Sequence, residues 1–438
     1  MKIKRLLAII LAVSLIGGSF AGCTGGTGGT SSTSGGNSSA PASDELPETL
    51  ENPNISIVYW YNQDQYEQDK AADENIYDPI LEAIPDFEAK YGGKVDVIYA
   101  EWGKMLEEAT NRQNAGEAPD LIEVYDRIMH NVIFTDMVQP IDDYVTDADF
   151  SYYKVDRSLF SWKDKTYAIP IKPYLKYIMF NKDLFDLEGL THPDDLFREG
   201  KWNWEEFEKA GKALLQRKDG EISQFGFAGW GEIITQFMVA NGSGLINVDT
   251  KNGTVTSALK TPAVQNTITK FSDWLSEPNG FVHIDDNGSM WGWWDNGALG
   301  MICGKEFPNT NPFDVGMAPL PTGSDLKGKN VYVYPQAFAM PAGSKNPKGA
   351  AVFMRMVNDK QKEVGDAKEA ARYGQENYDM IYADDVNYVY AYDKATKNID
   401  TIVASIINYA ADKTPAATIA ETLEPELNSD IELIYSGQ

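Results

Sequence analysis

The chain has 438 residues, of which 43% are hydrophobic and 24% are charged, and its formal net charge at pH 7 is −27. This composition is that of a soluble globular protein, and the length suggests more than one domain. The acidic balance argues against nucleic-acid binding, which needs a basic face. Two cysteines (Cys23 and Cys303) and three scattered histidines form no CxxC or HExxH motif, and GxSxG, GxxxxGK[ST] and GxGxxG motifs are absent. We therefore expect no metal site and no cofactor.

The N-terminus has the pattern of an exported segment. Lys2, Lys4 and Arg5 precede residues 6–16, which are almost purely apolar and too few to span a membrane. The following "FAGC" resembles the lipobox of bacterial lipoproteins, although Phe20 stands where an aliphatic residue is usual. The resemblance implies that residues 1–22 are a signal peptide and that Cys23 is lipidated and anchors the protein to a membrane. The alternative is ordinary secretion, with Cys23 as a free or disulfide-bonded thiol.

Residues 23–52 follow this signal and are rich in glycine, serine and threonine. They have no apolar periodicity, so they cannot bury surface and are predicted to be a flexible linker. A coil of this kind has an r.m.s. span on the order of 30 Å.

The rest of the chain alternates between strand and helix patterns. Strand-like segments at 54–61, 94–99 and 119–125 alternate with helical periodicity at 77–91 and 104–116. Farther on, Asn203 and Glu206 form a capping box, and Asn252-Gly253 predicts a hairpin turn within 247–257. Residues 317–323 are predicted to be extended, and 343–357 to be a loop followed by a helix. The alternation predicts an α/β fold with a mostly parallel sheet.

Several of these segments carry a family resemblance. "APDLIEV", "YAIPI…YIMFNKDLF", "WNWEEFEKAGKAL", "WDNGALGM", "VGMAPLP" and "AMPAGSKNPKGAAVFMRMV", in this order, resemble the extracellular solute-binding proteins of bacterial ABC sugar importers, in particular the maltose/maltodextrin-binding group. The resemblance runs from about residue 54 to 360. It implies a type II periplasmic-binding-protein-like fold, in which two α/β lobes close by a hinge on a ligand in the cleft between them.

The resemblance also implies where the lobes divide. Residues 53–170 plus 316–358 would form the N-terminal lobe, and residues 171–315 plus 359–438 the C-terminal lobe. Crossovers are expected near Ile169–Tyr174 and Phe313–Leu320.

A sugar ring needs aromatic faces for its C–H groups and planar polar groups for its hydroxyls. By resemblance and by position at predicted strand ends, the expected ligand contacts are Trp60, Asn62, Asp64, Gln65, Glu107, Asp126, Arg127, Tyr174, Trp230, Lys305, Phe307 and Tyr334. Gln65 and Tyr174 stand where the family has a lysine and a glutamate, which suggests a different sugar. The alternatives are a solvated helix face for Glu107, a surface ion pair for Asp126 and Arg127, and core packing for Trp230.

The stretch "SMWGWWDNGALGMICG" at 289–304 holds three tryptophans in four positions. Trp291 and Trp294 are one helical turn apart, and spaced aromatic residues on a helix usually face inward, so we expect both in the core. Trp293 points elsewhere, and its environment is left open. Phe307 stands where the family's stacking tryptophan is found.

The resemblance implies a monomeric binding protein, not an enzyme, on the outer face of the bacterial cytoplasmic membrane. It would capture an oligosaccharide and deliver it to an ABC permease. One alternative is a lipid-anchored glycoside hydrolase, which would need two carboxylates flanking one bond. Another is a binding protein for a peptide, a polyamine or iron. The aromatic content of 12% favours a sugar, the scarcity of histidine argues against metal capture, and the net charge favours a neutral ligand.

Overall fold

The computed structural model describes residues 45–125, 129–276, 278, 280–304, 311–390 and 398–435, without the side chains of residues 129–131. The predicted signal peptide, Cys23 and most of the predicted linker therefore lie outside the described residues. None of the helices in the described part of the chain is long and apolar enough to cross a membrane.

The first sheet has five strands in the order β2-β1-β3-β16-β6. Strand β1 is parallel to β2 and β3, whereas β16 is antiparallel to β3 and β6. The strands are β1 (Ile55–Tyr59), β2 (Val95–Tyr99), β3 (Leu121–Tyr125), β6 (Ala168–Pro170) and β16 (Gln336–Ala339). The helices in this half of the chain are α1 (Gln63–Ala72), α2 (Pro79–Tyr91), α3 (Met105–Asn114), α4 (Met129–Phe134), α5 (Ala148–Ser151), the 3₁₀ helix η1 (Arg157–Phe160) and α12 (Pro347–Lys360).

Local sequence signals determine where these elements begin and end. Asp78 caps α2 by accepting a hydrogen bond from the backbone N–H of Leu81, and Pro79 occupies the first helical position. Gly92 ends α2 in the left-handed conformation (φ 75°), which glycine adopts at little cost. The short hairpin β4 (Ser161–Trp162) and β5 (Lys165–Thr166) precedes β6.

The second sheet has eight strands. Six of them follow the order β12-β9-β13-β7-β15-β17, while β14 pairs with β7 and β8 pairs with β9. The strands are β7 (Tyr174–Asn181), β8 (Gln216–Lys218), β9 (Glu221–Trp230), β12 (Val282–Asp285), β13 (Leu299–Cys303), β14 (Val315–Pro319), β15 (Lys329–Tyr334) and β17 (Val386–Val389). A separate hairpin is formed by β10 (Ile246–Asp249) and β11 (Thr254–Ser257).

Helices surround the second sheet. Asn203 caps α8 by accepting hydrogen bonds from the backbone N–H groups of Glu205 and Glu206. The helices of this half are α6 (Lys182–Leu187), α7 (Pro193–Arg198), α8 (Trp204–Leu214), α9 (Ile233–Ala240), α10 (Pro262–Leu275), α11 (Ser289–Asp295), α13 (Asp366–Tyr373), α14 (Gln375–Tyr382), α15 (Ile399–Ala411) and α16 (Ala416–Tyr435). A single π-helical turn, η2 (Gln361–Gly365), joins α12 to α13.

The sheet pairing corrects one boundary expected from the sequence. Residues 316–334 were assigned to the N-terminal lobe, but β14 and β15 both pair with β7 in the second sheet. The chain therefore returns to the first sheet between Tyr334 and Gln336, and not within Phe313–Leu320. Extended segments look alike in sequence, and only long-range pairing decides which sheet they join. In the other direction, the chain leaves the first sheet after Pro170 and enters the second at Tyr174.

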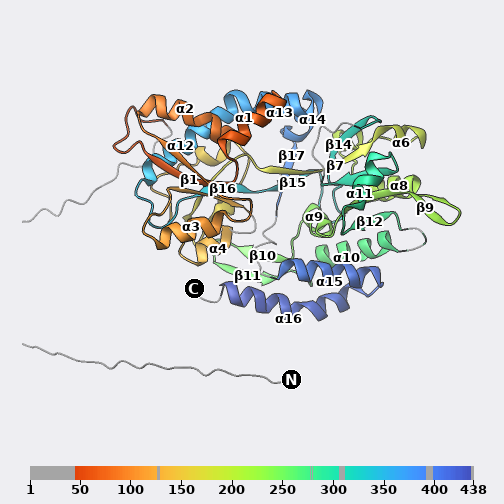
Figure 1. Ribbon diagram of the computed structural model, residues 1–438. Coiled ribbons are helices and arrows are strands. Elements are labelled where there is room, and N and C mark those ends of the chain that lie inside the picture. Colours follow the sequence, from red (N-terminus) through yellow and green to blue (C-terminus); the bar gives the residue numbers. More distant parts are fainter. Residues whose placement is uncertain are drawn as a thin grey trace, which may run out of the picture. The chain divides into compact units, whose positions relative to one another are not determined.

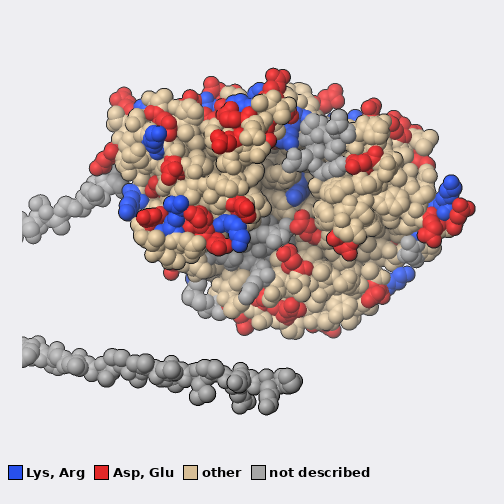
Figure 2. Space-filling view, in the orientation of Figure 1, with Lys and Arg blue, Asp and Glu red and all other residues tan. Residues whose placement is uncertain are grey.

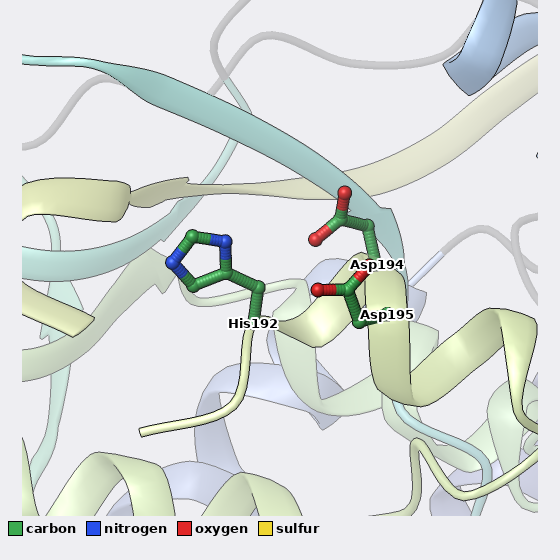
Figure 3. A group of neighbouring side chains, drawn as sticks. All are labelled: His192, Asp194 and Asp195. Atoms are coloured by element: carbon green, nitrogen blue, oxygen red, sulfur yellow. The ribbon is translucent and has the colours of Figure 1, made fainter. Parts of the chain in front are cut away.

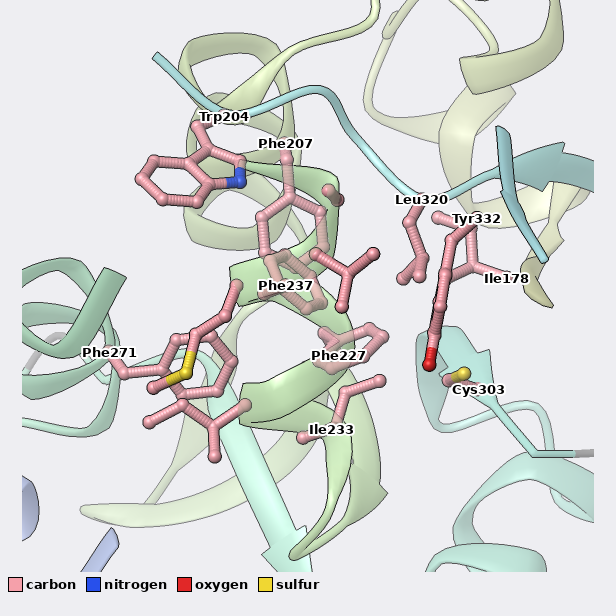
Figure 4. Packing of buried hydrophobic residues seen from close by; sticks show 14 of the residues in the cluster. Ile178, Trp204, Phe207, Phe227, Ile233, Phe237, Phe271, Cys303, Leu320 and Tyr332 are labelled. Atoms are coloured by element: carbon pink, nitrogen blue, oxygen red, sulfur yellow. The ribbon is translucent and has the colours of Figure 1, made fainter. Parts of the chain in front are cut away.

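Each sheet has its own hydrophobic core. The core of the second sheet is rich in aromatic rings, and Figure 4 shows Phe207, Phe227, Phe237 and Phe271 packed against one another and against aliphatic neighbours. The rings of Phe207 and Phe227 lie 5.2 Å apart in an edge-on arrangement, and Phe227 is fully buried. The core of the first sheet is formed by a second large cluster that includes Ile57, Phe87 and Phe338. Two separate cores allow the two halves to behave as separate rigid bodies.

The two halves also touch away from the sheets. Helix α16 packs against α10, α15 and β11 in the second half and against α4 in the first (Figure 1). At its end, the ring of Tyr435 meets the ring of Phe134 at 4.5 Å. The backbone N–H of Lys163, in the β4–β5 turn, donates to the carbonyl of Thr250 in the β10–β11 turn at 2.7 Å.

Candidate ligand-binding site

Aromatic side chains lie at the carboxyl ends of the three parallel strands of the first sheet. Trp60 follows β1, Trp102 follows β2, and Tyr125 ends β3. The ring of Trp102 stacks on that of Tyr125, with centroids 5.0 Å apart, and meets the ring of Trp60 edge-on at 5.6 Å. Because Trp102 is 54% exposed, the group offers an open aromatic face. We call Trp60, Trp102 and Tyr125 the first aromatic platform.

The second sheet has a corresponding feature. Its strands β9, β12 and β13 are parallel, so their carboxyl ends lie at one edge. Trp230 ends β9, and Trp291 lies on α11, which follows β12. The two rings are half-buried, with centroids 5.9 Å apart and an interplanar angle of 68°. We call Trp230 and Trp291 the second aromatic platform.

A glycine lets these two rings come together. Gly304 follows β13 with φ +100°, a conformation that other residues rarely adopt. A Cβ atom at this position would lie 3.3 Å from the ring of Trp230 and 3.9 Å from the ring of Trp291. The backbone of Gly304 therefore passes directly beside the second aromatic platform, where a side chain would displace a ring.

Side chains of β7 and β15 meet beside the crossover between the two sheets. In the antiparallel pair of β7 and β15, Tyr174 is opposite Tyr334, and Lys176 is opposite Tyr332. The ammonium of Lys176 lies 4.2 Å from the ring centroid of Tyr334 and 5.3 Å from that of Tyr174. Tyr174 is 44% exposed. These strands thus present two phenol rings and one cation beside the crossover.

Strand directions bring both platforms toward this crossover. Tyr125, at the end of β3, is paired with Gln336, the first residue of the first sheet after the crossover. Strand β13 is antiparallel to β7, so its carboxyl end points toward Tyr174, where β7 begins. In Figure 2 the surface is hollowed between the two halves of the molecule. The arrangement is suited to holding a ligand between aromatic faces from two sheets.

Asn62, Gln65 and Glu107, predicted contacts at helices α1 and α3, already have local partners. The side chain of Asn62 caps α1 by accepting a hydrogen bond from the backbone N–H of Gln65 at 2.8 Å. The side-chain amide of Gln65 donates to Asp69, and Asp64 lies exposed in the first turn of α1. Glu107 forms a 2.9 Å ion pair with Lys104, and both side chains are 64% exposed. Their roles as ligand contacts stay predictions.

Other predicted contacts fall outside the described residues. These are Asp126, Arg127, Lys305 and Phe307, as well as the predicted lipid attachment site Cys23. Of the remaining ones, Trp60 and Trp230 belong to the two platforms, and Tyr174 and Tyr334 lie together at the crossover.

The three clustered tryptophans have different environments. Trp294 is fully buried and meets the ring of Phe313 edge-on at 5.1 Å, as the helical spacing predicts. Trp293 packs edge-on against Phe225 at 5.1 Å. Trp291 was expected in the core but is only half-buried, because the first turn of α11 lies at the edge of the sheet beside Trp230.

Trp102, Tyr125, Lys176 and Trp291 were not predicted as contacts from the sequence. Trp102 and Tyr125 did carry a usable signal, since each is an aromatic residue at or just after the end of a predicted strand. Lys176 had none, because its position depends on the long-range pairing of β7 with β15.

Comparison with known proteins identifies the chain. Residues 71–364 match the family of bacterial extracellular solute-binding proteins. The chain belongs to this family. Similar proteins include binding proteins of Brucella abortus (strain 2308) and Brucella suis biovar 1 (strain 1330), each 29% identical over 193 residues. These matches cover 42% of this chain and 43% of each relative, so the chain spans less than half the length of these relatives.

Solved solute-binding proteins share the fold. A cyclo/maltodextrin-binding protein complexed with maltotetraose has a TM-score of 0.63 at 16% identity, covering 89% of this chain and 97% of its own. An ABC substrate-binding protein of Listeria monocytogenes in complex with cycloalternan has a TM-score of 0.60 at 13% identity, covering 87% and 99%. UgpB of Mycobacterium tuberculosis in complex with glycerophosphocholine has a TM-score of 0.61 at 17% identity, covering 86% and 98%. These similarities confirm the predicted two-lobed α/β fold.

A partly buried charge cluster lies at the crossover of this solute-binding protein. Lys172, between β6 and β7, forms ion pairs with Asp366 at 3.0 Å and with Glu369, both on α13. The ammonium also lies 4.6 Å from the ring centroid of Tyr382 on α14. The hydroxyl of Tyr152, in the first half of the chain, donates to Asp366. The cluster therefore connects the first crossover with the segment through which the chain returns to the second sheet.

Proposed function

We propose that this solute-binding protein is the substrate-binding component of an ABC importer. It captures an oligosaccharide in the cleft between its two sheets and delivers it to a membrane permease. The lobes of the proposal are residues 53–170 plus 336–360 and residues 171–334 plus 361–435, which the crossovers join.

The two aromatic platforms carry this proposal. Neutral sugars bind aromatic rings through their apolar C–H faces, and platforms on both lobes would contact both sides or successive units of a sugar chain. Tyr174 and Tyr334 add phenol hydroxyls at the crossover. The net charge of −27 favours a neutral sugar over an anionic one.

The cellular setting follows from the N-terminal sequence. A lipidated Cys23 and the glycine-rich linker would tether a monomeric binding protein to the outer face of the cytoplasmic membrane, next to its permease. Replacing Cys23 by alanine should abolish the incorporation of radiolabelled palmitate that we expect for the native protein. Equal labelling of Cys23→Ala and the native protein would contradict lipid anchoring at this residue.

Calorimetric titration tests the ligand class. The protein is titrated with cello-, xylo-, manno-, malto- and laminari-oligosaccharides of two to five units, and each sugar is examined afterwards by chromatography. Binding of one series with full recovery of the sugar is expected. Shortened sugar products would instead support a glycoside hydrolase, and a lack of heat for all series would support a non-sugar solute.

A further inference from the structure

A histidine and two carboxylates converge at the start of α7, on the second half of the molecule. One potential ligand atom from each of His192, Asp194 and Asp195 lies within 4.8 Å of the others. Figure 3 shows the two carboxylates directed toward the imidazole, whose Nδ1 lies on the side facing them. None of these residues belongs to the aromatic platforms or the crossover.

Each of the three side chains is held in place by a neighbouring charged side chain. Nε2 of His192 lies 3.0 Å from a carboxylate oxygen of Asp186, and the imidazole packs against the rings of Phe180 and Phe185. Nη1 of Arg198 contacts one oxygen of Asp194 at 3.0 Å and one oxygen of Asp195 at 3.1 Å. A carboxylate that holds the far nitrogen of a histidine is the usual support of a metal-ligating imidazole.

Asp194 supplies an independent sign that a cation is needed. The residue is only 8% exposed, and its Oδ1 is buried without a hydrogen-bond partner among the described residues. Burying a carboxylate oxygen away from water without a hydrogen-bond donor costs free energy, and such oxygens are rare in folded proteins. A metal ion between His192 and the carboxylates would satisfy it.

The charges around these three side chains also favour a bound cation. Asp186, Asp194 and Asp195 supply three negative charges, whereas Arg198 is the cation hydrogen-bonded to the last two. When Nε2 of His192 donates to Asp186, Nδ1 carries a lone pair that faces the lone pairs of two carboxylates. Three acceptors facing one another repel unless a proton or a cation lies between them.

We propose that His192, Asp194 and Asp195 bind one divalent transition-metal ion such as Zn²⁺. One imidazole and two carboxylate oxygens are suitable Zn²⁺ ligands, and a water can complete a tetrahedron. Asp195 is exposed at the surface, which gives the ion a path of entry. The ion is structural: it ties the start of α7 to the end of α6 through the Asp186–His192 contact.

Calorimetric titration of ZnCl₂ into chelator-treated protein at pH 7 tests this proposal. We expect saturable binding of about one equivalent, accompanied by a rise in the melting temperature. His192→Gln and Asp195→Asn should each weaken binding at least tenfold. Asp195 is exposed, so its variant should fold normally. His283→Gln is the matched control, since His283 is also half-buried and lies 3.7 Å from a carboxylate oxygen of Asp285.

Three results would overturn the proposal. One is the absence of saturable Zn²⁺ binding to the native protein. Another is undiminished binding in both His192→Gln and Asp195→Asn, which would place the ion elsewhere. The third is an equal loss in His283→Gln, which would indicate nonspecific binding to surface histidines. The proposal does not depend on the ligand of the cleft, and a sugar titration should give the same affinity with and without Zn²⁺.

Discussion

The indole of Trp102, which follows β2, stacks on the ring of Tyr125 at the end of β3 with an interplanar angle of 16°. The stack exists because β2 and β3 both run parallel to β1, which brings their carboxyl ends to one edge of the sheet. It leaves more than half of Trp102 in contact with solvent. A large, rigid and exposed aromatic surface of this kind is typical of a binding site.

Replacing Trp102 by alanine should therefore affect binding far more than stability. We expect about a tenfold loss of oligosaccharide affinity, because a stacking face worth about 1.4 kcal/mol is removed. Its melting temperature should change little. Trp294→Ala is the contrasting variant: Trp294 is fully buried, so its loss should cost about 3–5 kcal/mol of unfolding free energy. Calorimetry and denaturant unfolding of both variants would test this, and equal stability losses would contradict it.

Gly304→Ala should weaken binding through the second aromatic platform. The new Cβ would lie 3.3 Å from the ring of Trp230 and would push it away from Trp291. Gly116→Ala is the control, because Gly116 also has a positive φ, of +78°, but has no atom within 4 Å of the added Cβ. Both variants should lose about 1 kcal/mol of stability from backbone strain. Only Gly304→Ala should lose sugar affinity, and the same loss in both would exclude a specific effect on Trp230.

The ion pairs of Lys172 at the crossover should stabilise the folded protein. Lys172→Met leaves the partly buried carboxylates of Asp366 and Glu369 without their shared cation, and we expect a loss of about 1–3 kcal/mol in unfolding free energy. The control Lys209→Met breaks an exposed pair with Glu206 and should cost less than about 1 kcal/mol. Adding Glu369→Gln to Lys172→Met should restore part of the loss. Equal effects of the two lysine variants in urea unfolding would contradict this role.

Glu123 should make the stability depend on pH. Burial, followed by the charge of Asp78, raises the pKa of this carboxyl to about 8, and its Oε2 has no hydrogen-bond partner among the described residues. The folded state therefore holds a proton that the unfolded chain releases at lower pH. Protonated Glu123 therefore makes its full contribution to the free energy of unfolding below the usual glutamate pKa. This contribution falls by roughly 1.4 kcal/mol per pH unit as the pH rises toward 8.

Glu123→Gln removes this titration while keeping the shape of the side chain. We expect the native protein to lose stability relative to Glu123→Gln between pH 5 and pH 8. Thermal unfolding of both proteins across this range is the measurement. Parallel curves would show that Glu123 does not titrate in this window.

The sequence was sufficient for most elements whose signals are local. The hairpin turn at Asn252-Gly253, the cap at Asn203 and the strands near 55–59 and 121–125 are found where their residue patterns predict them. The lobe predicted for residues 316–334 was wrong, because only the long-range pairing of β14 and β15 with β7 decides which sheet these strands join. The environment of Lys176 depends on the same pairing. Helical spacing correctly predicted that Trp294 is buried in the core. No local pattern showed that Trp291 lies beside Trp230.

Titration of one bound oligosaccharide into the native protein, Trp102→Ala, Trp230→Ala and the double variant tests the central claim most directly. A ligand held between the two sheets should bind about tenfold or more weakly to each single variant and should be recovered intact. A loss confined to one platform, or cleavage of the sugar by the native protein, would contradict capture between the lobes.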